Sequence, residues 1–303
     1  MVQKKAAPAI KAGIFTIALS IFLVLIKAFA YVVTGSVAVL SSLIDSFMDV
    51  NVSTLNYWAI RYSAKPADEE HRYGHGKIEG LAALLQASLI SGAAVFLAFE
   101  ALSRLTGGQQ MQNHIVAVVV MTVSAAVSLV IVAIQNHALT KSGSLAVESE
   151  KAHYSSDIIV HGGVMMTVII QYYNGPAWID AAFALLVVVW LANTAREIAG
   201  KGLDMVLDRE LPEEQRRKIL DLIKAHEGVL GVHDLRTSRS GMKEIITFDI
   251  EADPKLSLHD AHAITKDLER EILEIFPEAE VMIHVDPHGE IEDSRHKVAG
   301  VHH

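Results

Sequence analysis

The sequence contains no cysteine. Disulfide bonds, thiolate metal sites and cysteine nucleophiles are therefore excluded, and any bound metal must be held by histidine nitrogen and carboxylate oxygen. The chain supplies such ligands amply, with 15 histidines and 35 acidic residues. An HExxH motif, which marks many zinc proteases, is also absent, and no catalytic carboxylate follows the candidate ligands below. We therefore expect neither a metalloenzyme nor an organic cofactor.

Clusters of lysine and arginine are missing as well. The formal net charge is −9 and the pI is near 5.9. Phosphate recognition relies on clustered basic side chains, so we expect no nucleic-acid partner. An acidic chain suits cations better.

Long apolar runs are absent from about residue 210 onward but frequent before it. The chain is 51% hydrophobic, with a mean hydropathy of +0.32, and a helix needs about 20 apolar residues to cross a bilayer. The run after "MVQKK" is too long for a signal-peptide core, so we interpret it as a retained span. We predict a transmembrane domain over residues 1–208, an all-α six-helix bundle with spans at about 12–33, 36–60, 78–103, 113–138, 145–171 and 177–200.

The connections between these spans differ in charge at the two membrane faces. Those at 34–36, 106–113 and 172–178 hold no lysine or arginine. Basic residues gather in the connection 61–77, near Lys141 and at the N-terminus, so the positive-inside rule predicts that both termini are cytoplasmic.

Residues 209–290 have the patterns of a soluble domain. An amphipathic helix begins near Pro212 and stops at Gly228, two alternating strands follow, and a second helix and a last strand complete the order αββαβ. This order predicts a small cytoplasmic α+β domain of two layers, ferredoxin-like or metallochaperone-like, with helices on one face of a sheet. We expect the polar tail, residues 291–303, to be disordered.

Two pairs of ionisable residues lie inside predicted spans. Asp45 and Asp49, and likewise His153 and Asp157, are four residues apart, which places each pair on one side of a helix. An ionised aspartate at the centre of a membrane helix costs about 2.5–3.5 kcal/mol on insertion scales. At helical rise the two pairs fall at matching depths, about 12–20 Å from the outer face. Three carboxylates and one imidazole could then form a tetrahedral site for Zn²⁺ or a similar ion.

Interpretations without a metal site remain open for these residues. The pairs could be ordinary polar contacts within the bundle, or could face a water-filled crevice without binding anything. Lys27, also within a span, is expected to snorkel or to pair inside the bundle.

The paired residues, with six spans and a C-terminal αββαβ domain, closely resemble the cation diffusion facilitator family. "GSVAVLSSLIDSFMDV", "PADEEHRYGHGKIEGLAAL" and "HDLRTSRSG" look like its bacterial zinc and ferrous-iron efflux branch. The resemblance extends to about Pro287. It implies a homodimeric secondary active transporter of the bacterial cytoplasmic (inner) membrane, which exports Zn²⁺ from the cytoplasm in exchange for protons by alternating access. Cd²⁺ and Fe²⁺ remain alternative substrates, because all three ions accept N/O ligands.

The resemblance also implies site residues. The transport site maps onto Asp45, Asp49, His153 and Asp157, and a second metal site in the loop after the second span maps onto Asp68, His71 and His75. A binuclear cytoplasmic site, with Zn²⁺ as a structural ion that helps to hold two domains together, maps onto His233, Asp249, His262, His284 and Asp286.

Three further positions qualify this assignment. Asp249 departs from the pattern, because close bacterial relatives usually place a bridging histidine there. His259 could contribute a ligand or be a solvated side chain. A dimer interlock between Lys77 and Asp208 is also implied.

A different class of function is a membrane-anchored metal-sensing or metal-storage receptor without transport. In that case the spans would only anchor the soluble domain. The intramembrane pairs argue against it, because an anchor gains nothing from costly buried charges.

Overall fold

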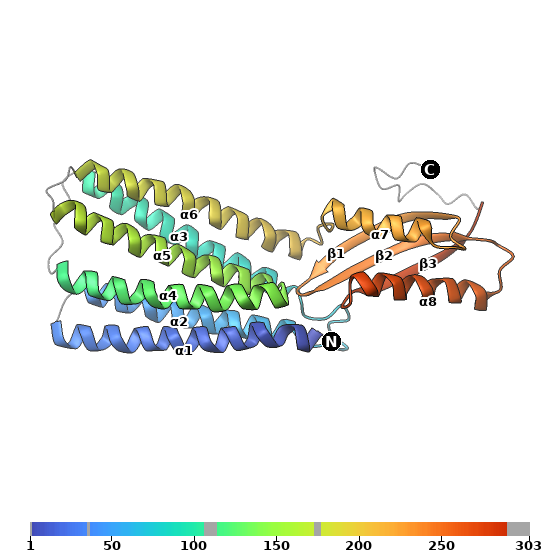
Figure 1. Cartoon of the computed structure of the whole chain (residues 1–303), viewed down its shortest axis with the longest axis horizontal. Coiled ribbons are helices and arrows are strands. Elements are labelled where there is room, and N and C mark those ends of the chain that lie inside the picture. The colour runs from blue at the N-terminus through green and yellow to red at the C-terminus, as the bar shows by residue number, and fades with distance from the viewer. Residues whose placement is uncertain (1, 35–36, 106–113, 173–176, 290–303) are drawn as a thin grey trace. The chain divides into compact units, whose positions relative to one another are not determined.

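The computed structural model describes residues 2–34, 37–105, 114–172 and 177–289 of the protein. They form two compact units, a helical unit of residues 3–203 and a C-terminal unit that begins at Asp204 (Figure 1). The predicted tail 291–303 and the predicted connection 106–113 lie outside the described residues, as do parts of the connections 34–36 and 172–178.

Six long helices lie alongside one another in the helical unit (Figure 1). Four of them, α1, α3, α4 and α6, are long and apolar enough to cross a membrane. The remaining two, α2 and α5, have 27 and 28 residues but carry more polar and charged side chains. The bounds are α1 Val2–Thr34, α2 Val37–Ser63, α3 Ile78–Leu105, α4 His114–Ser142, α5 Leu145–Tyr172 and α6 Ala177–Val206.

Small side chains let the helices of this unit approach one another closely. One buried cluster joins Ala9 and Ala12 of α1 to Ile60 of α2, Ala138 of α4 and Ala146 of α5. Alanine permits close backbone packing where lipid supplies no hydrophobic drive between helices. Large apolar side chains point outward instead, as expected for a surface in contact with lipid: Phe29, Phe96 and Leu186 are about 70% exposed.

The C-terminal unit has the predicted order αββαβ. Its elements are α7 (Glu213–Ala225), β1 (Gly231–Ser240), β2 (Lys243–Ala252), α8 (Leu258–Ile275) and β3 (Glu280–Pro287). The sheet order is β1-β2-β3, with β1 and β2 antiparallel and β2 and β3 parallel. Parallel strands cannot be joined by a tight turn, and α8 makes the required crossover between them.

Alternation along β2 separates the two faces of the sheet. Ile246, Phe248 and Ile250 are fully buried against α7 and α8, whose core residues include Ile219 and Ile272. Because successive strand residues point to opposite faces, Asp249 projects away from this core. The face of the sheet opposite the helices is therefore free to carry polar ligands.

Candidate metal centres

The structure brings Asp49 of α2 together with His153 and Asp157 of α5. The Nε2 atom of His153 lies 3.2 Å from Oδ1 of Asp49 and 3.8 Å from Oδ2 of Asp157. In a tetrahedral zinc site with bonds of about 2.0–2.2 Å, neighbouring ligand atoms lie about 3.3–3.6 Å apart. The three side chains are only 15–27% exposed, so their charges are weakly screened by water. The group has the donor chemistry and the spacing of a divalent metal site.

Asp45 lies one turn before Asp49 on α2, and its side chain is exposed. It is not one of the three residues whose ligand atoms lie within 4.8 Å of one another. In this conformation three of the four predicted ligands therefore converge, and the fourth lies at the edge of the group.

Lys27 of α1 is buried beside the same stretch of α2. Its Nζ donates to Oγ of Ser46 at 2.7 Å and to the carbonyl oxygen of Ser42 at 3.2 Å. Asp49, Asp45 and Asp157 are the charged groups that act on it. These contacts agree with the expectation that Lys27 pairs inside the bundle. Its ammonium is held between α1 and α2 and offsets part of the carboxylate charge.

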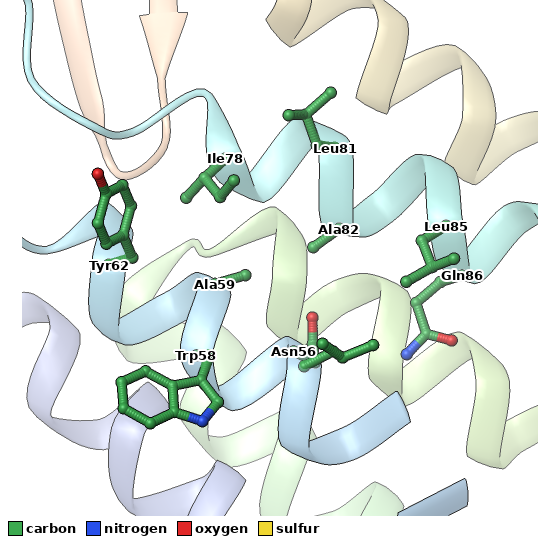
Figure 2. Close-up of a pocket in the computed structure, with 10 residues that line it drawn as sticks. Asn56, Trp58, Ala59, Tyr62, Ile78, Leu81, Ala82, Leu85 and Gln86 are labelled. Carbon is green, nitrogen blue, oxygen red and sulfur yellow. The ribbon is translucent and has the colours of Figure 1, made fainter. Parts of the chain in front are cut away.

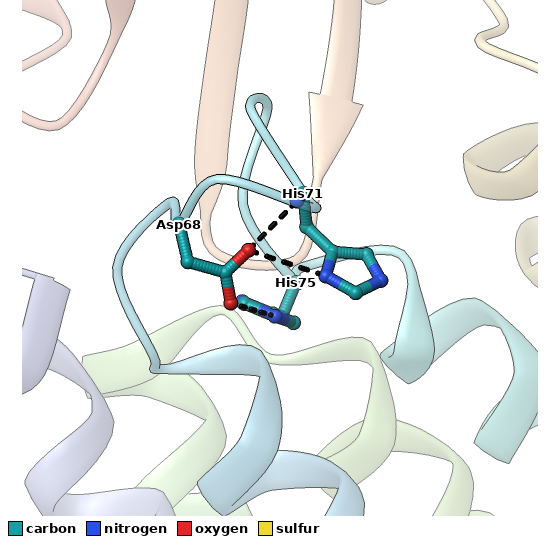
Figure 3. A group of neighbouring side chains, drawn as sticks. All are labelled: Asp68, His71 and His75. Carbon is teal, nitrogen blue, oxygen red and sulfur yellow. Dashed lines mark hydrogen bonds and ion pairs between the residues drawn. The ribbon is translucent and has the colours of Figure 1, made fainter.

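A second group lies in the loop between α2 and α3, where Asp68 faces two histidines (Figure 3). Its Oδ1 is 3.3 Å from Nδ1 of His71, and its Oδ2 is 3.2 Å from Nε2 of His75. Gly74 has a φ of 80°, a backbone conformation that glycine adopts without a steric penalty. This turn carries the chain from His71 to His75, so that both rings reach one carboxylate.

Backbone hydrogen bonds favour the ionised form of the Asp68 carboxylate, which is the form that binds a cation. The backbone N–H groups of His71 and Glu70 donate to Oδ1 at 2.7 and 3.0 Å. These bonds, that of His71 foremost, hold the pKa of Asp68 below its usual value. His75 is the buried member of the group, and among the described residues its Nδ1 has no hydrogen-bond partner. Because its pKa is lowered, the Asp68 carboxylate stays ionised, which metal coordination requires.

A third group is assembled by strand register on the polar face of the sheet. His233 of β1 pairs with Asp249 of β2, and Asp249 pairs with His284 of β3. Directly opposed residues point to the same face, so the register places these side chains in one row. Asp286 follows two residues after His284, and its Oδ2 lies 3.4 Å from Nε2 of His233.

A bulge in β1 follows His233 directly. Asp234 and Leu235 oppose one residue of β2, and Asp234 has a φ of 50°. The guanidinium of Arg236 holds the Asp234 carboxylate at 2.8 and 3.0 Å. The bulge ends the regular pairing beside the predicted ligand.

Burial raises the pKa of Asp249, although His233 and His284 act in the opposite direction. The carboxylate is thus partly desolvated, and a bound cation would offset that cost. His233, Asp249 and Asp286 lie within metal-binding distance of one another.

The remaining predicted residues lie around these groups. His284 contacts Asp286, with Nε2 3.0 Å from Oδ1, but it is outside the group of three. His262 and His259 are exposed on α8 and are not in that group. Lys77 and Asp208 belong to different units, so their interlock stays a prediction.

Sequence reasoning missed a polar network next to the membrane group. Glu150 of α5, Gln135 of α4 and Asn56 of α2 are buried and joined by hydrogen bonds. The signals that could have revealed it were single polar residues inside apolar runs and the Glu150-x-x-His153 spacing, one helical turn.

Comparison with known proteins covers both units. Residues 13–207 match the cation efflux transmembrane domain, and residues 211–288 match the cation efflux protein cytoplasmic domain. The chain is 39% identical to the cation-efflux pump FieF of Cronobacter sakazakii over 265 residues, which is 88% of each protein. It is 36% identical to FieF of Yersinia pestis over 285 residues, or 94% of this chain and 95% of that protein.

Among solved structures, the metal-bound C-terminal domain of the CzcD transporter from Thermotoga maritima is 35% identical. That comparison covers 26% of this chain and 93% of that one, with a TM-score of 0.25.

Proposed function

The chain belongs to the cation diffusion facilitator family, and from that premise we propose that it is an antiporter that exports Zn²⁺ from the cytoplasm in exchange for protons. Members of this family are transporters and not enzymes. Cd²⁺ and Fe²⁺ are alternative substrates with compatible ligand chemistry.

The observation that carries the proposal is the group Asp49, His153 and Asp157. It joins two helices that are long enough to span a membrane but more polar than their four apolar neighbours. We infer that both also span, which gives six membrane helices. Asp49, His153 and Asp157, which meet in the group, are among the polar residues that lower the apolar character of these two helices.

Exchange of metal for protons follows from the chemistry of these ligands. A metal ion needs a neutral imidazole and ionised carboxylates, so metal binding releases protons and protonation expels metal. In the inward-facing state Zn²⁺ would bind Asp49, His153 and Asp157, with Asp45 completing the shell after a side-chain rotation. In the outward-facing state, protons on His153 and one carboxylate would replace the charge of the departing ion.

The cytoplasmic unit fits a resident metal ion. Its three clustered ligands are nitrogen and oxygen donors on neighbouring strands, which suits Zn²⁺ in a chain without cysteine. We propose that His284, whose Nε2 lies 3.0 Å from Oδ1 of Asp286, joins His233, Asp249 and Asp286 when the metal binds. His262 lies on α8, which packs on the other face of the sheet, and its part in the site stays a prediction from the resemblance. The match to a domain family designated ZT_dimer supports a homodimer.

The inner membrane is the expected location of a multi-pass cation efflux protein of this kind. We propose the orientation with both termini in the cytoplasm. The basic residues of the 61–77 connection support it, because positive charge favours that side. The metal ligands Asp68, His71 and His75 would then meet ions before they enter the bundle.

Reconstituted vesicles test the function. Asp49→Asn keeps the size of the side chain but removes a charged ligand, and it should abolish zinc uptake driven by a pH gradient. Glu148→Gln is a matched control, since Glu148 lies on α5 but pairs with Lys201. If Asp49→Asn transports zinc at the wild-type rate, the assignment of the transport site is wrong. The receptor alternative predicts no flux even in the wild type.

A further inference from the structure

Lys27 of α1 is a buried ammonium that the exchange of metal for protons does not itself require. The residue is only 3% exposed, and it lies within Lys5–Val33, a stretch long and apolar enough to cross a membrane. A charged group inside a membrane is costly, and such groups usually find partners within the bundle and serve a function. Lys27 is therefore a candidate for a role at the metal group beside it.

Two uncharged oxygen atoms of α2 fix the position of the ammonium. Its Nζ donates to Oγ of Ser46 at 2.7 Å and to the carbonyl oxygen of Ser42 at 3.2 Å. Because Ser42, Ser46 and Asp49 are spaced by four and three residues, they share one side of α2. The ammonium is thus held on the side of α2 that carries Asp49, by bonds that do not neutralise its charge.

The carboxylates of the metal group balance this charge. Asp49, Asp45 and Asp157 are the groups whose negative charge acts on Lys27. When ionised, the three carboxylates together with the ammonium carry a net charge of −2, so one divalent ion beside a neutral His153 makes the group neutral. Without Lys27 the loaded group would keep a net charge of −1, among side chains that water screens weakly.

The pocket between α2 and α3 offers the ammonium no other counter-ion. It has a volume of about 450 Å³ and a mostly apolar lining, to which Asn56 and Gln86 contribute carboxamides (Figure 2). None of the described residues that line it is charged, and Lys27 is not one of them. The charge of Lys27 is therefore left to the carboxylates of the metal group.

We propose that Lys27 tunes the affinity of the transport site, because its fixed positive charge repels the bound metal ion and so allows the ion to be released. This inference rests on the proposed transport site. Three carboxylates in a weakly screened site attract a divalent ion strongly, and a transport protein must release its ion as well as bind it. Lys27 reduces this attraction without occupying a ligand atom, since its hydrogen bonds go to Ser42 and Ser46.

A purely structural role of Lys27 makes a different prediction. If Lys27 only joins α1 to α2, its hydrogen bonds matter and its charge does not. A neutral donor at this position would then preserve zinc affinity. Loss of the bond to Ser46 would also act in the same direction as loss of Lys27 itself.

The zinc kinetics of the full chain, reconstituted in vesicles, separate charge from anchoring. Uptake driven by a pH gradient is measured over a range of zinc concentrations. Lys27→Gln keeps N–H donors but removes the charge, so the zinc concentration at half-maximal uptake should fall on the order of tenfold. The maximal rate should fall as well, because release is slower. Lys27→Arg retains the charge and should keep the wild-type half-saturation, as should Lys11→Gln, which changes an exposed lysine of the same helix.

Ser46→Ala is a second test, which remains available if Lys27→Gln does not fold. It removes the hydroxyl that accepts a hydrogen bond from Nζ but leaves the charge of Lys27 in place. The ammonium is then less firmly held away from the carboxylates and competes more strongly with zinc. The zinc concentration at half-maximal uptake should therefore rise, in the direction opposite to that of Lys27→Gln.

Each result decides the matter. The proposal is overturned if Lys27→Gln leaves the half-saturating zinc concentration unchanged or raises it, or if Lys27→Arg lowers it as much as Lys27→Gln does. Should Lys27→Gln not fold, an unchanged or lower value in Ser46→Ala overturns the proposal. Zinc uptake by Asp49→Asn at the wild-type rate would instead contradict the transport site on which the inference rests.

Discussion

Gly202 lies where α6 packs against α3, and adding one methyl group there should loosen the helical unit. A Cβ at this position would lie 2.9 Å from the carbonyl oxygen of Gly80 and 3.0 Å from Cγ of Leu84. The first of these atoms belongs to the backbone, so the helices themselves must separate. Gly200 is two residues earlier on the same helix, and a Cβ there meets nothing within 4 Å.

The two positions allow the steric cost to be isolated. Replacing glycine by alanine inside a helix gains about 1 kcal/mol from backbone propensity at either site. Overpacking costs about 1–3 kcal/mol, and it applies to Gly202→Ala alone. The propensity gain cancels in the difference, so Gly202→Ala should be about 1–3 kcal/mol less stable than Gly200→Ala.

Thermal unfolding of the two variants in detergent, followed by fluorescence, measures this difference. One kcal/mol corresponds to about 2–4 °C in Tm for a domain of 150–250 residues. The midpoint of Gly202→Ala should therefore lie several degrees below that of Gly200→Ala. Equal midpoints, or a higher one for Gly202→Ala, would refute the close contact between α3 and α6.

Four further predictions concern the single side chains of Ser144, Asp249 and Asp68. Ser144→Ala removes a hydroxyl that donates to the buried Glu79 carboxylate at 2.7 Å, so it should lower the free energy of unfolding by about 1–3 kcal/mol. Ser88 is exposed, and Ser88→Ala should leave the midpoint of thermal unfolding nearly unchanged. Asp249→Asn should weaken zinc binding to the C-terminal unit, by calorimetry, without affecting uptake at the membrane site; unchanged binding would remove Asp249 from the ligand set. Because burial raises the pKa of Asp249, the folded metal-free unit keeps the carboxyl proton to a higher pH than the unfolded chain does. The stability of the unit should therefore fall as the pH rises from the pKa of Asp249 in the unfolded chain through its pKa in the folded unit. Asp249→Asn should abolish this fall, which melting curves taken at acidic pH would measure. Asp68→Asn retains an oxygen acceptor for the N–H of His71, so the turn should stay folded. The loss of the charged ligand should reduce the zinc affinity of the loop. Equal zinc affinity of the variant and the wild type would contradict this prediction.

The membrane group could be anticipated because its geometry is mostly local. His153 and Asp157 are one helical turn apart, and helical rise alone places Asp49 at a similar depth. Its side-chain conformations are not local, however. Asp45 shares a side of α2 with Asp49 but is exposed, since its rotamer depends on neighbours that periodicity does not specify.

The metal group of the C-terminal unit shows how much the alternation of apolar and polar residues along a strand can predict. A period of two predicts that Asp249 points away from the core, but not which residues stand beside it. Pairing with His233 and His284 depends on strand register, and the bulge at Asp234 shifts that register. The β2–β3 pairing also depends on the crossover through α8, which is a tertiary property.

Helix ends and the Glu150 network were the least predictable features. The first helix begins at Val2 rather than near residue 12, because a helix can continue beyond the apolar run that reveals it. Glu150, Asn56 and Gln135 lie on three different helices, so their contacts follow from packing that no single sequence pattern contains.

Simultaneous recording of zinc and proton flux in the same vesicles tests the central claim most directly. The wild-type protein should move protons against zinc, with both fluxes rising and falling together as the zinc gradient is varied. Asp49→Asn should lose both fluxes, and Glu148→Gln should keep both. Zinc flux without a proton counterflux, or coupled flux that persists in Asp49→Asn, would contradict the account.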